Sequence, residues 1–495
     1  FLIQLQSQLV KKSLSLSVAP AAKFYEEETK KFVGSLPFKL TDAQRKAAWE
    51  ILRDLAKDKP MSRLLEGDVG SGKTLVAIIA MLNVVLNNQQ AVLMVPTEIL
   101  AKQHFETVSR LLAGFGVKVG LVTRSQKKIF KSQIPITKKI PNSNNQKIKL
   151  NAADIVENSD IIIGTHALIQ EDVKFNNLAL AIIDEQHRFG VEQRKMLLKN
   201  TSPQPSPCKG EGERLVPHLL SMTATPIPRS LALALYGDLE LSVLNEMPKD
   251  RKKIITKVVP EIKRTAAYEF IRAQVKAGRQ VFVICPLIDP SDKLGVKSVE
   301  NEYQKLSKII FSDLTIGKLH GKMKPAAKEK IMSAFAEASA GKAKRIDILV
   351  STSVVEVGVD VPNASVMIIE GADRFGLAQL HQFRGRVGRS IHQSYCFLFA
   401  DSQAEPTLAR LKALVDCSSG FELAKLDLKF RGPGEFYGTA QKGFPELKMA
   451  SLFDYALMKQ ARYWAVKLVS EDAGLNKWPA LKEKLGEWEK SVHLE

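Results

Sequence analysis

The chain has 495 residues, of which 45% are hydrophobic and 25% are charged, and Lys and Arg outnumber Asp and Glu by 72 to 53. A chain of this length and composition can bury the cores of two or three domains, which excludes collagen-like, fully disordered and disulfide-scaffold proteins. The formal charge of +19 favours a polyanionic partner, most often nucleic acid, although charge alone also fits a generally basic soluble protein.

The cysteines, histidines and apolar runs give further expectations about the cellular compartment, structural metals and membrane helices. Four widely separated cysteines predict a reducing, intracellular compartment, and eight histidines without metal-ligand spacing predict no structural metal. No uninterrupted apolar run reaches the roughly 18 residues that a membrane helix needs. We therefore expect no membrane partner.

Short β-branched runs alternate with amphipathic helices along most of the chain, which is typical of parallel α/β sheets. Helices are predicted at residues 42–55 and 100–112. Strands are predicted at residues 91–95, 160–164, 178–184, 219–222, 281–285, 346–351, 366–370 and 395–400.

The alternation pauses at residues 247–252, a charged, proline-containing stretch that is typical of a linker, and then restarts. This pause divides the chain into two α/β domains followed by a different, mainly helical region. The expected boundaries are 1–37 for an N-terminal helical linker, 38–247 and 253–405 for the two domains, and 406–495 for the C-terminal region.

Three tracts, at residues 121–150, 201–213 and 337–344, have the composition of insertions. The first holds eight Lys or Arg residues and no acidic residue. Such a tract could touch nucleic acid, but its composition favours a solvated surface loop.

A glycine-rich segment after the predicted strand at residues 64–65 matches the pattern GxxxxGK[ST]. Glycines let backbone N–H groups approach phosphates, and the apolar helix that follows adds its positive end. Lys73 would reach the β- and γ-phosphates of a nucleotide, and the hydroxyl of Thr74 would be a ligand of Mg²⁺. The expected nucleotide-binding residues are Gly67, Asp68, Val69, Gly70, Ser71, Gly72, Lys73 and Thr74.

Two acidic residues, Asp184 and Glu185, end the predicted strand at 178–184. Carboxylates at the carboxyl end of a parallel strand lie at the usual ligand edge of such a sheet. Asp184 would hold Mg²⁺ and Glu185 would activate the attacking water. Alone, such a pair is more often a helix cap, but together with the phosphate loop it indicates hydrolysis of a nucleoside triphosphate.

Two further segments suggest a motor. Thr223 and Thr225 follow a predicted strand and offer hydroxyls that could link the nucleotide site to bound nucleic acid. Arg386 and Arg389 are three residues apart, which predicts one face of a helix, and could act as fingers for the transition-state phosphate. A salt-bridged surface helix is the alternative.

Seven segments follow the order of helicase motifs I, Ia, Ib, II, III, V and VI, and residues 38–400 resemble superfamily 2 helicases. The segments are 67–74, 96–101, 164–167, 184–187, 221–226, 351–360 and 382–389. The resemblance implies two RecA-like parallel-sheet lobes in tandem that use ATP and Mg²⁺. It also implies adenine recognition by Gln44, nucleotide contacts from Gly358 and Asp360, a catalytic role for Gln382 beside Arg386 and Arg389, and DNA coupling through Thr97, Thr165, His166, Thr223 and Thr225.

Finer detail resembles the bacterial RecG branch-migration helicases, at residues 164–170, 184–190, 222–229 and 373–377. Residues 430–441 resemble that family's translocation motif, which couples ATP-driven closure to movement on duplex DNA and implies roles for Arg431 and Gln441. Gly432 and Gly434 around Pro433 predict a tight turn there. The family usually has Arg where this chain has Ala440, and its N-terminal wedge domain has no counterpart in residues 1–37.

The resemblance implies a monomeric helicase of 3′→5′ polarity that acts on replication forks and Holliday junctions in recombination and repair. It further implies a cytoplasmic, nucleoid-associated location and single-stranded-DNA-binding protein as a second partner. A transcription-repair coupling translocase is one alternative, but that family usually has Glu where this chain has Gln186. A nucleic-acid-binding scaffold with a vestigial ATPase is another, and the presence of Lys73, Asp184 and Glu185 argues against it.

Overall fold

The computed structural model of the chain describes residues 1–15, 17–131, 151–170, 173–185, 215–224, 239–248, 252–286, 299–336, 345–352, 361–388, 392–402, 404–435 and 455–491. The chain divides into two compact units: residues 1–67, 72–246 and 433–495 form the first, and residues 68–71 and 247–432 form the second. Each unit contains one sheet of mainly parallel strands. The predicted fold class, two RecA-like α/β lobes with a mainly helical C-terminal region, is confirmed.

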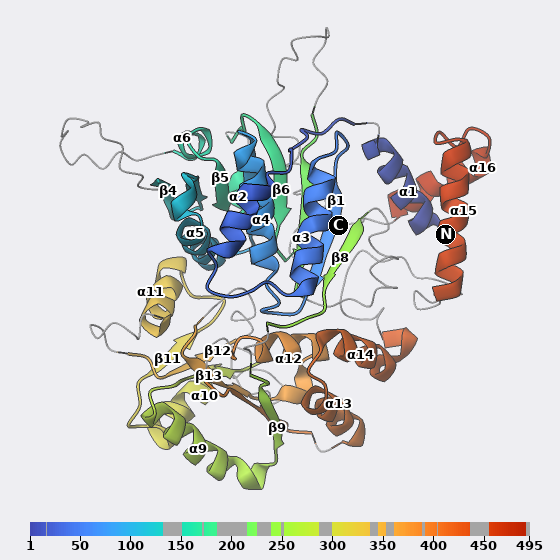
Figure 1. Ribbon diagram of the computed structural model, residues 1–495. Helices are drawn as coiled ribbons and strands as arrows, with labels where there is room; N and C mark the ends of the chain where they lie inside the picture. The colour runs from blue at the N-terminus through green and yellow to red at the C-terminus, as the bar shows by residue number, and fades with distance from the viewer. Residues whose placement is uncertain are drawn as a thin grey trace, which may run out of the picture. The chain divides into compact units, whose positions relative to one another are not determined.

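The sheet of the first unit has the strand order β4-β3-β5-β2-β6-β7-β1-β8, and only β3 and β4 pair antiparallel. Its central strands are continuous apolar runs because helices cover them; α4, for example, packs against β1, β2 and β6 (Figure 1). The strands are β1 (Ser62–Gly67), β2 (Gln90–Met94), β3 (Lys118–Val122), β4 (Lys127–Lys131), β5 (Ile161–Gly164), β6 (Leu178–Ile183), β7 (His218–Thr223) and β8 (Glu240–Leu244). The helices are α2 (Glu26–Gly34), α3 (Asp42–Leu55), α4 (Lys73–Leu86), α5 (Glu98–Leu111) and α6 (Ala152–Glu157), with 3-10 turns at Ala113–Phe115 and His166–Ile169.

The sheet of the second unit has the order β11-β12-β10-β13-β14-β9, and all of these neighbours are parallel. Its strands are β9 (Ile255–Val259), β10 (Gln280–Ile284), β11 (Ile316–Leu319), β12 (Ile348–Ser351), β13 (Ala364–Ile369) and β14 (Tyr395–Phe399). Its helices are α9 (Arg264–Lys276), α10 (Val299–Lys305), α11 (Pro325–Ala336), α12 (Leu377–Arg384), α13 (Glu405–Asp416) and most of α14 (Gly420–Glu435), with shorter helical turns at Glu261–Lys263, Leu306–Ile310 and Ala372–Arg374.

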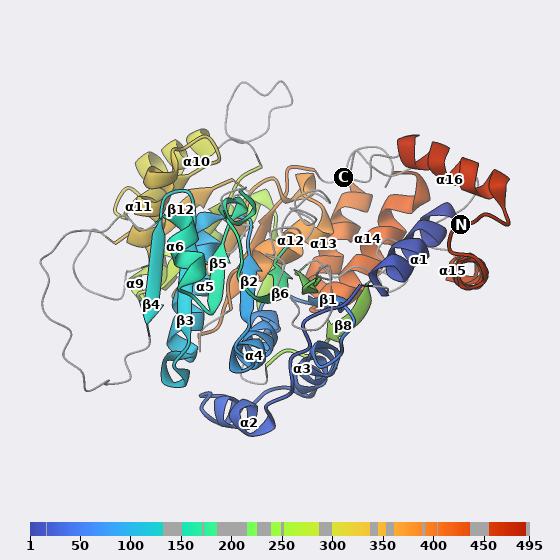
Figure 2. The ribbon, with the colours of Figure 1, turned by 90° about the horizontal axis from the view of Figure 1, so that it is seen from above.

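The first and last helices of the chain pack together within the first unit. Helix α1 (Leu2–Ser15) lies beside α15 (Tyr455–Glu471) and α16 (Pro479–Ser491), as Figures 1 and 2 both show in blue and red. Leu5 of α1 is fully buried there, against Ala465 and Val469 of α15 and Leu485 of α16. Burial of apolar side chains from both ends of the sequence therefore stabilises this small bundle.

The eight strands predicted from the alternating pattern are present, as is the strand predicted at 64–65. Strands β3, β4, β8, β9 and β11 were missed because they are partly polar and, except for β3, lie at sheet edges. Two expectations were wrong. Residues 127–131 of the basic tract form edge strand β4 rather than a surface loop. Lys127 and Lys128 place charges on an edge that would otherwise template pairing with another chain. The remainder of that tract, at 132–150, lies outside the described residues.

The second wrong expectation is the turn at Pro433. The structure continues α14 through Gly432, Pro433 and Gly434 to Glu435. A proline already has a helical φ, so near a helix end it can be accommodated with the loss of one backbone hydrogen bond.

A candidate ATP site and nucleic-acid interface at the carboxyl edge of the first sheet

Five adjacent strands of the first unit place five motif segments along one edge of the sheet. In the order β5-β2-β6-β7-β1, each strand is parallel to its neighbour, so all five carboxyl ends lie at the same edge. The segments that follow these strands begin at Thr165, Val95, Asp184, Ala224 and Asp68 respectively. This is the edge at which open α/β sheets bind ligands.

The phosphate loop follows β1 and leads into α4. Gly70 and Gly72 have φ values of 82° and 92°, which residues with a side chain rarely adopt. Gly72 is the N-cap of α4. Lys73 is nearly buried, and its Nζ donates a hydrogen bond of 2.6 Å to the carbonyl oxygen of Gly67. The lysine is thus held at the start of the loop, next to the half-buried Thr74.

Gln44 lies behind this loop. Its Oε1 accepts a hydrogen bond from the backbone N–H of Thr41, and the Thr41 hydroxyl accepts one from the Gln44 N–H, which forms a capping box at the start of α3. Gln44 is only 3% exposed. The capping box fixes the amide of Gln44 close to Gly72.

Asp184 lies at the end of β6 and makes contacts through both carboxylate oxygens. Its Oδ1 accepts the backbone N–H of Glu185 at 3.0 Å, and its Oδ2 lies 3.3 Å from Nε2 of His104. Burial alone would raise the pKa of the Asp184 carboxyl, but the contact with His104 and the positive charge of Lys73 lower this pKa overall. Asp184 is therefore an ionised carboxylate in a nearly buried position.

Glu185 adopts a φ of 53°, which is uncommon for a residue with a side chain. Strained backbone of this kind is held in place only by its surroundings and is concentrated at functional sites. Glu185 directly follows Asp184, so two carboxylates of different exposure stand together at the strand end.

The predicted DNA-coupling residues have different environments. Thr97 is the N-cap of α5, and its hydroxyl accepts the Leu100 N–H. Thr165 and Thr223 are buried at the ends of β5 and β7, whereas His166 is exposed. Among the described residues of this set, His166 has the most exposed side chain.

The prediction that Arg386 lies on a helix is wrong, whereas Arg389, its predicted partner on the same helix face, lies outside the described residues. Helix α12 ends at Arg384, Gly385 caps it, and Gly388 has a φ of 79°, so Arg386 lies in the turn after the helix. Gly385 is required by packing: a Cβ there would lie 2.8 Å from Cβ of Val69. Gln382 and Arg386 are both buried.

Sequence reasoning missed a buried polar chain in the second unit. Nε2 of His381 lies 3.1 Å from Oδ1 of Asp68, and Arg384 donates to Nδ1 of His381 at 2.8 Å. Arg384 also donates to the carbonyl oxygens of Leu414 and Cys417, and burial lowers the pKa of its guanidinium. The function of Arg384 in this chain of contacts is therefore to hold the end of α13.

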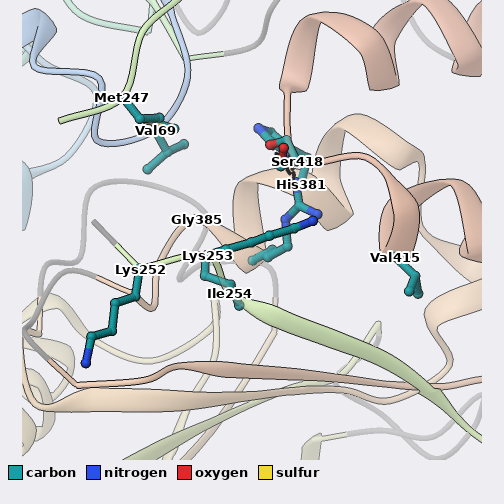
Figure 3. A pocket seen from close by; sticks show the side chains of 10 residues that line it. Val69, Met247, Lys252, Lys253, Ile254, His381, Gly385, Val415 and Ser418 are labelled. Carbon is teal, nitrogen blue, oxygen red and sulfur yellow. Dashed lines mark hydrogen bonds between the residues drawn. The ribbon is translucent and has the colours of Figure 1, made fainter. Parts of the chain in front are cut away.

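A cavity of about 240 Å³ opens beside this polar chain. Figure 3 shows Val69 and Met247 on one side of it and Val415 on the other, with His381 between them. The sequence carried one signal for this region: His381 and Arg384 are three residues apart, the spacing that places two side chains on one face of a helix.

Of the remaining predicted residues, Arg431 lies on α14. Thr225, Gly358, Asp360, Arg389 and Gln441 lie outside the described residues.

The donors present fit Mg²⁺. A carboxylate at Asp184 and a hydroxyl at Thr74 are hard oxygen donors, and Mg²⁺ in nucleotide sites takes one or two protein ligands plus phosphate oxygens. Among the described residues there is no group of three or more His, Cys, Asp or Glu that could hold a metal on its own. Within the same ranges, no helix has the length and apolar character needed to cross a membrane.

Three family models match the chain in order. They are the DEAD/DEAH box helicase at residues 41–233, the helicase conserved C-terminal domain at residues 262–390, and the C-terminal part of domain 3 of ATP-dependent DNA helicase RecG at residues 417–491.

Three relatives are ATP-dependent DNA helicases RecG. The protein of Synechocystis sp. is 46% identical over 93% of this chain and 51% of its own length. The Aquifex aeolicus protein is 44% identical over 98% of this chain and 58% of its own length. The Streptococcus pneumoniae protein is 41% identical over 100% of this chain and 68% of its own length. The chain thus spans between half and about two thirds of the length of these relatives.

Solved structures of helicases are also similar to this chain. The structure of RecG bound to a three-way DNA junction superposes with a TM-score of 0.73 at 39% identity, covering 94% of this chain and 55% of that chain. Yeast Dbp5 bound to RNA and ADP BeF3 has a TM-score of 0.53 at 16% identity, covering 90% of this chain and all of that one, which shows the fold alone.

The two parallel sheets, the phosphate loop at the carboxyl edge of the first and the two helicase family matches together show the two-lobed RecA-like fold of superfamily 2 helicases. The C-terminal helices carry the third family match. The chain belongs to the RecG family of ATP-dependent DNA helicases.

Proposed function

We propose that this protein is an ATP-dependent DNA helicase and translocase that acts on branched DNA, such as replication forks and Holliday junctions, in recombination and repair. The observation that carries the proposal is the alignment of the phosphate loop, Asp184 and the predicted DNA-coupling threonines along one sheet edge. ATP hydrolysis and DNA contact would then share a continuous rigid surface. The structure of a relative bound to a three-way DNA junction supports the choice of substrate.

In this proposal, the backbone N–H groups of residues 67–74 hold the triphosphate, and Gln44 contacts the adenine. Lys73 leaves the Gly67 carbonyl and binds the β- and γ-phosphates. Thr74 and Asp184 would hold Mg²⁺, which would supply positive charge to neutralise the triphosphate. Glu185 orients the attacking water and accepts its proton.

Arg386 and Arg389 stabilise the negative charge of the transition state, Gln382 supports them, and Gly358 and Asp360 contact the nucleotide. Movement along DNA uses Thr97, Thr165, His166, Thr223 and Thr225, together with Arg431 and Gln441 of the C-terminal region.

We propose the domain division given by the sequence pattern: 1–37, 38–247, 253–405 and 406–495. DNA is the partner, single-stranded-DNA-binding protein is a second one, and the protein works as a cytoplasmic monomer near the nucleoid. The 3′→5′ polarity belongs to the same proposal.

The test is an assay of ATP hydrolysis and strand separation with three-way junctions, forks and linear duplex, with and without Mg²⁺. The proposal expects hydrolysis that requires Mg²⁺ and is stimulated more by junctions than by linear duplex. Hydrolysis that no DNA changes would contradict it, and equal stimulation by linear duplex would point to a translocase without junction preference.

A further inference from the structure

His104 is a buried polar residue on the mainly apolar face of α5, where Ser109 is the second buried polar residue. The face includes Leu100, Ala101, His104 and Val108, spaced three and four residues apart, and is turned toward the sheet. His104 is 7% exposed, so its ring is almost completely removed from water. A buried imidazole requires polar partners, because burying it without them costs free energy.

The partner of the His104 ring is Asp184. Nε2 lies 3.3 Å from Oδ2, yet the geometry is not that of a hydrogen bond, so the contact is a close but poorly aligned one. Oδ1 is meanwhile engaged by the N–H of Glu185, which leaves His104 as the neighbour of the second oxygen.

Helix α5 links this contact to the predicted DNA surface. The helix is capped by the hydroxyl of Thr97, which is one of the predicted DNA-coupling residues. The carboxylate of its first residue, Glu98, accepts hydrogen bonds from the backbone N–H and the hydroxyl of Ser125, which lies in the turn between β3 and β4. Between Thr97 and His104 there are two turns of regular helix, which transmit a displacement of the helix as a rigid element.

We propose that His104 is a positioning residue that transmits DNA binding at the start of α5 to the orientation of the Asp184 carboxylate. The inference rests on the proposed function, since it takes Thr97 as a DNA contact and Asp184 as a ligand of Mg²⁺. His104 touches neither nucleotide nor DNA in this account. It restrains one oxygen of Asp184, and a shift of α5 on DNA binding changes that restraint.

The test compares His104→Ala and His104→Gln with Val108→Ala in the full-length protein. Gln keeps an N–H donor that can reach Asp184, whereas Ala removes it. Val108 is buried one turn further along the same helix, and truncating it loosens the packing of α5 without removing a group that contacts Asp184. Thermal unfolding of all three variants establishes that the fold is retained.

Two quantities are measured: the affinity of Mn²⁺ with ADP by electron paramagnetic resonance, and the factor by which a three-way junction stimulates ATP hydrolysis. We expect His104→Ala to weaken Mn²⁺ affinity and to lower the stimulation factor, each by on the order of tenfold, as is typical for groups that orient a metal ligand. His104→Gln should recover most of both quantities, and Val108→Ala should change neither more than about twofold.

Two results would overturn the inference: both quantities within twofold of wild type in His104→Ala, or the same losses in Val108→Ala. A wild-type protein whose hydrolysis does not respond to any DNA would count against the proposed function, and with it against the transmission from α5. In that case the Mn²⁺ affinities would still show whether His104 positions Asp184.

Discussion

The amide of Gln44 occupies the space in which a side chain at position 72 would lie: a Cβ on Gly72 would be 2.2 Å from Nε2 of Gln44. Gln44 cannot move away freely, because its Oε1 closes the capping box with Thr41. The phosphate loop and the start of α3 therefore fit together only if residue 72 is glycine.

Replacing Gly72 with Ala should lower ATP affinity at least tenfold. The residue has a φ of 92°, which costs roughly 1–2 kcal/mol for a residue with a Cβ, and the contact with Gln44 adds to that cost. Binding of a fluorescent ATP analogue measures the effect. Gly114→Ala is the matched control, because nothing lies within 4 Å of its Cβ position. Equal affinity in Gly72→Ala and wild type would contradict this account of the loop.

Lys73→Ala should abolish ATP hydrolysis while DNA binding changes little. The Lys73 ammonium is held in the phosphate loop by its hydrogen bond to the Gly67 carbonyl, whereas DNA affinity is distributed over many basic side chains. Steady-state hydrolysis and junction binding at fixed salt are the two measurements. The exposed Lys46 provides a control of equal charge change, and Lys46→Ala should retain normal turnover. Normal turnover in Lys73→Ala would refute the assignment of the ATP site.

The neighbouring arginines Arg384 and Arg386 should respond differently to replacement by alanine. Arg386→Ala should lower kcat by on the order of 10³-fold with a much smaller change in ATP affinity, as expected for an arginine that acts on the transition state. Arg384→Ala leaves the carbonyl groups of Leu414 and Cys417 without this donor and should cost about 3 kcal/mol of stability.

Single-turnover hydrolysis and thermal unfolding separate these two effects. Retained kcat in Arg386→Ala, or retained melting temperature in Arg384→Ala, would show that the corresponding role is misassigned.

Stability should fall as the pH falls from about 6.5 to about 4 because of His218. Burial lowers the pKa of this histidine to about 4, against a smaller opposing effect of its hydrogen bond to the Pro20 carbonyl. Between these two pH values the unfolded chain binds a proton that the folded protein does not, so protonation favours unfolding by up to about 1.4 kcal/mol per pH unit.

Urea denaturation at several pH values measures this slope. His218→Gln is the informative variant, because Gln can still accept from Met61 and donate to Pro20 but does not titrate in this range. Subtracting its pH dependence from that of wild type isolates the histidine. Identical slopes in the two proteins would mean that His218 titrates normally in the folded state.

The sequence by itself determined the order of the motifs, the apolar central strands and the phosphate loop. Each of these features depends on a short local pattern of residues. A β-branched run specifies a buried strand, and the glycine spacing specifies a loop that phosphates can approach. Because parallel strands end at one edge, even the proximity of Asp184 to the loop follows from local pattern plus topology. The edge strand β4 did not follow, since its basic residues resemble those of a surface loop.

Only the tertiary structure decided which polar side chains act together. His104 and Asp184 are distant in sequence, and a histidine on a mainly apolar helix face gives no sign of the partner that burial will bring to it. Arg384 and Arg386 are two residues apart in one motif, yet α12 ends between them. Arg384 therefore donates to carbonyl groups at the end of α13, whereas Arg386 lies in a separate turn. Such pairings depend on where helices end and on which faces are buried against the sheet, and these are properties of the packed chain rather than of any short segment.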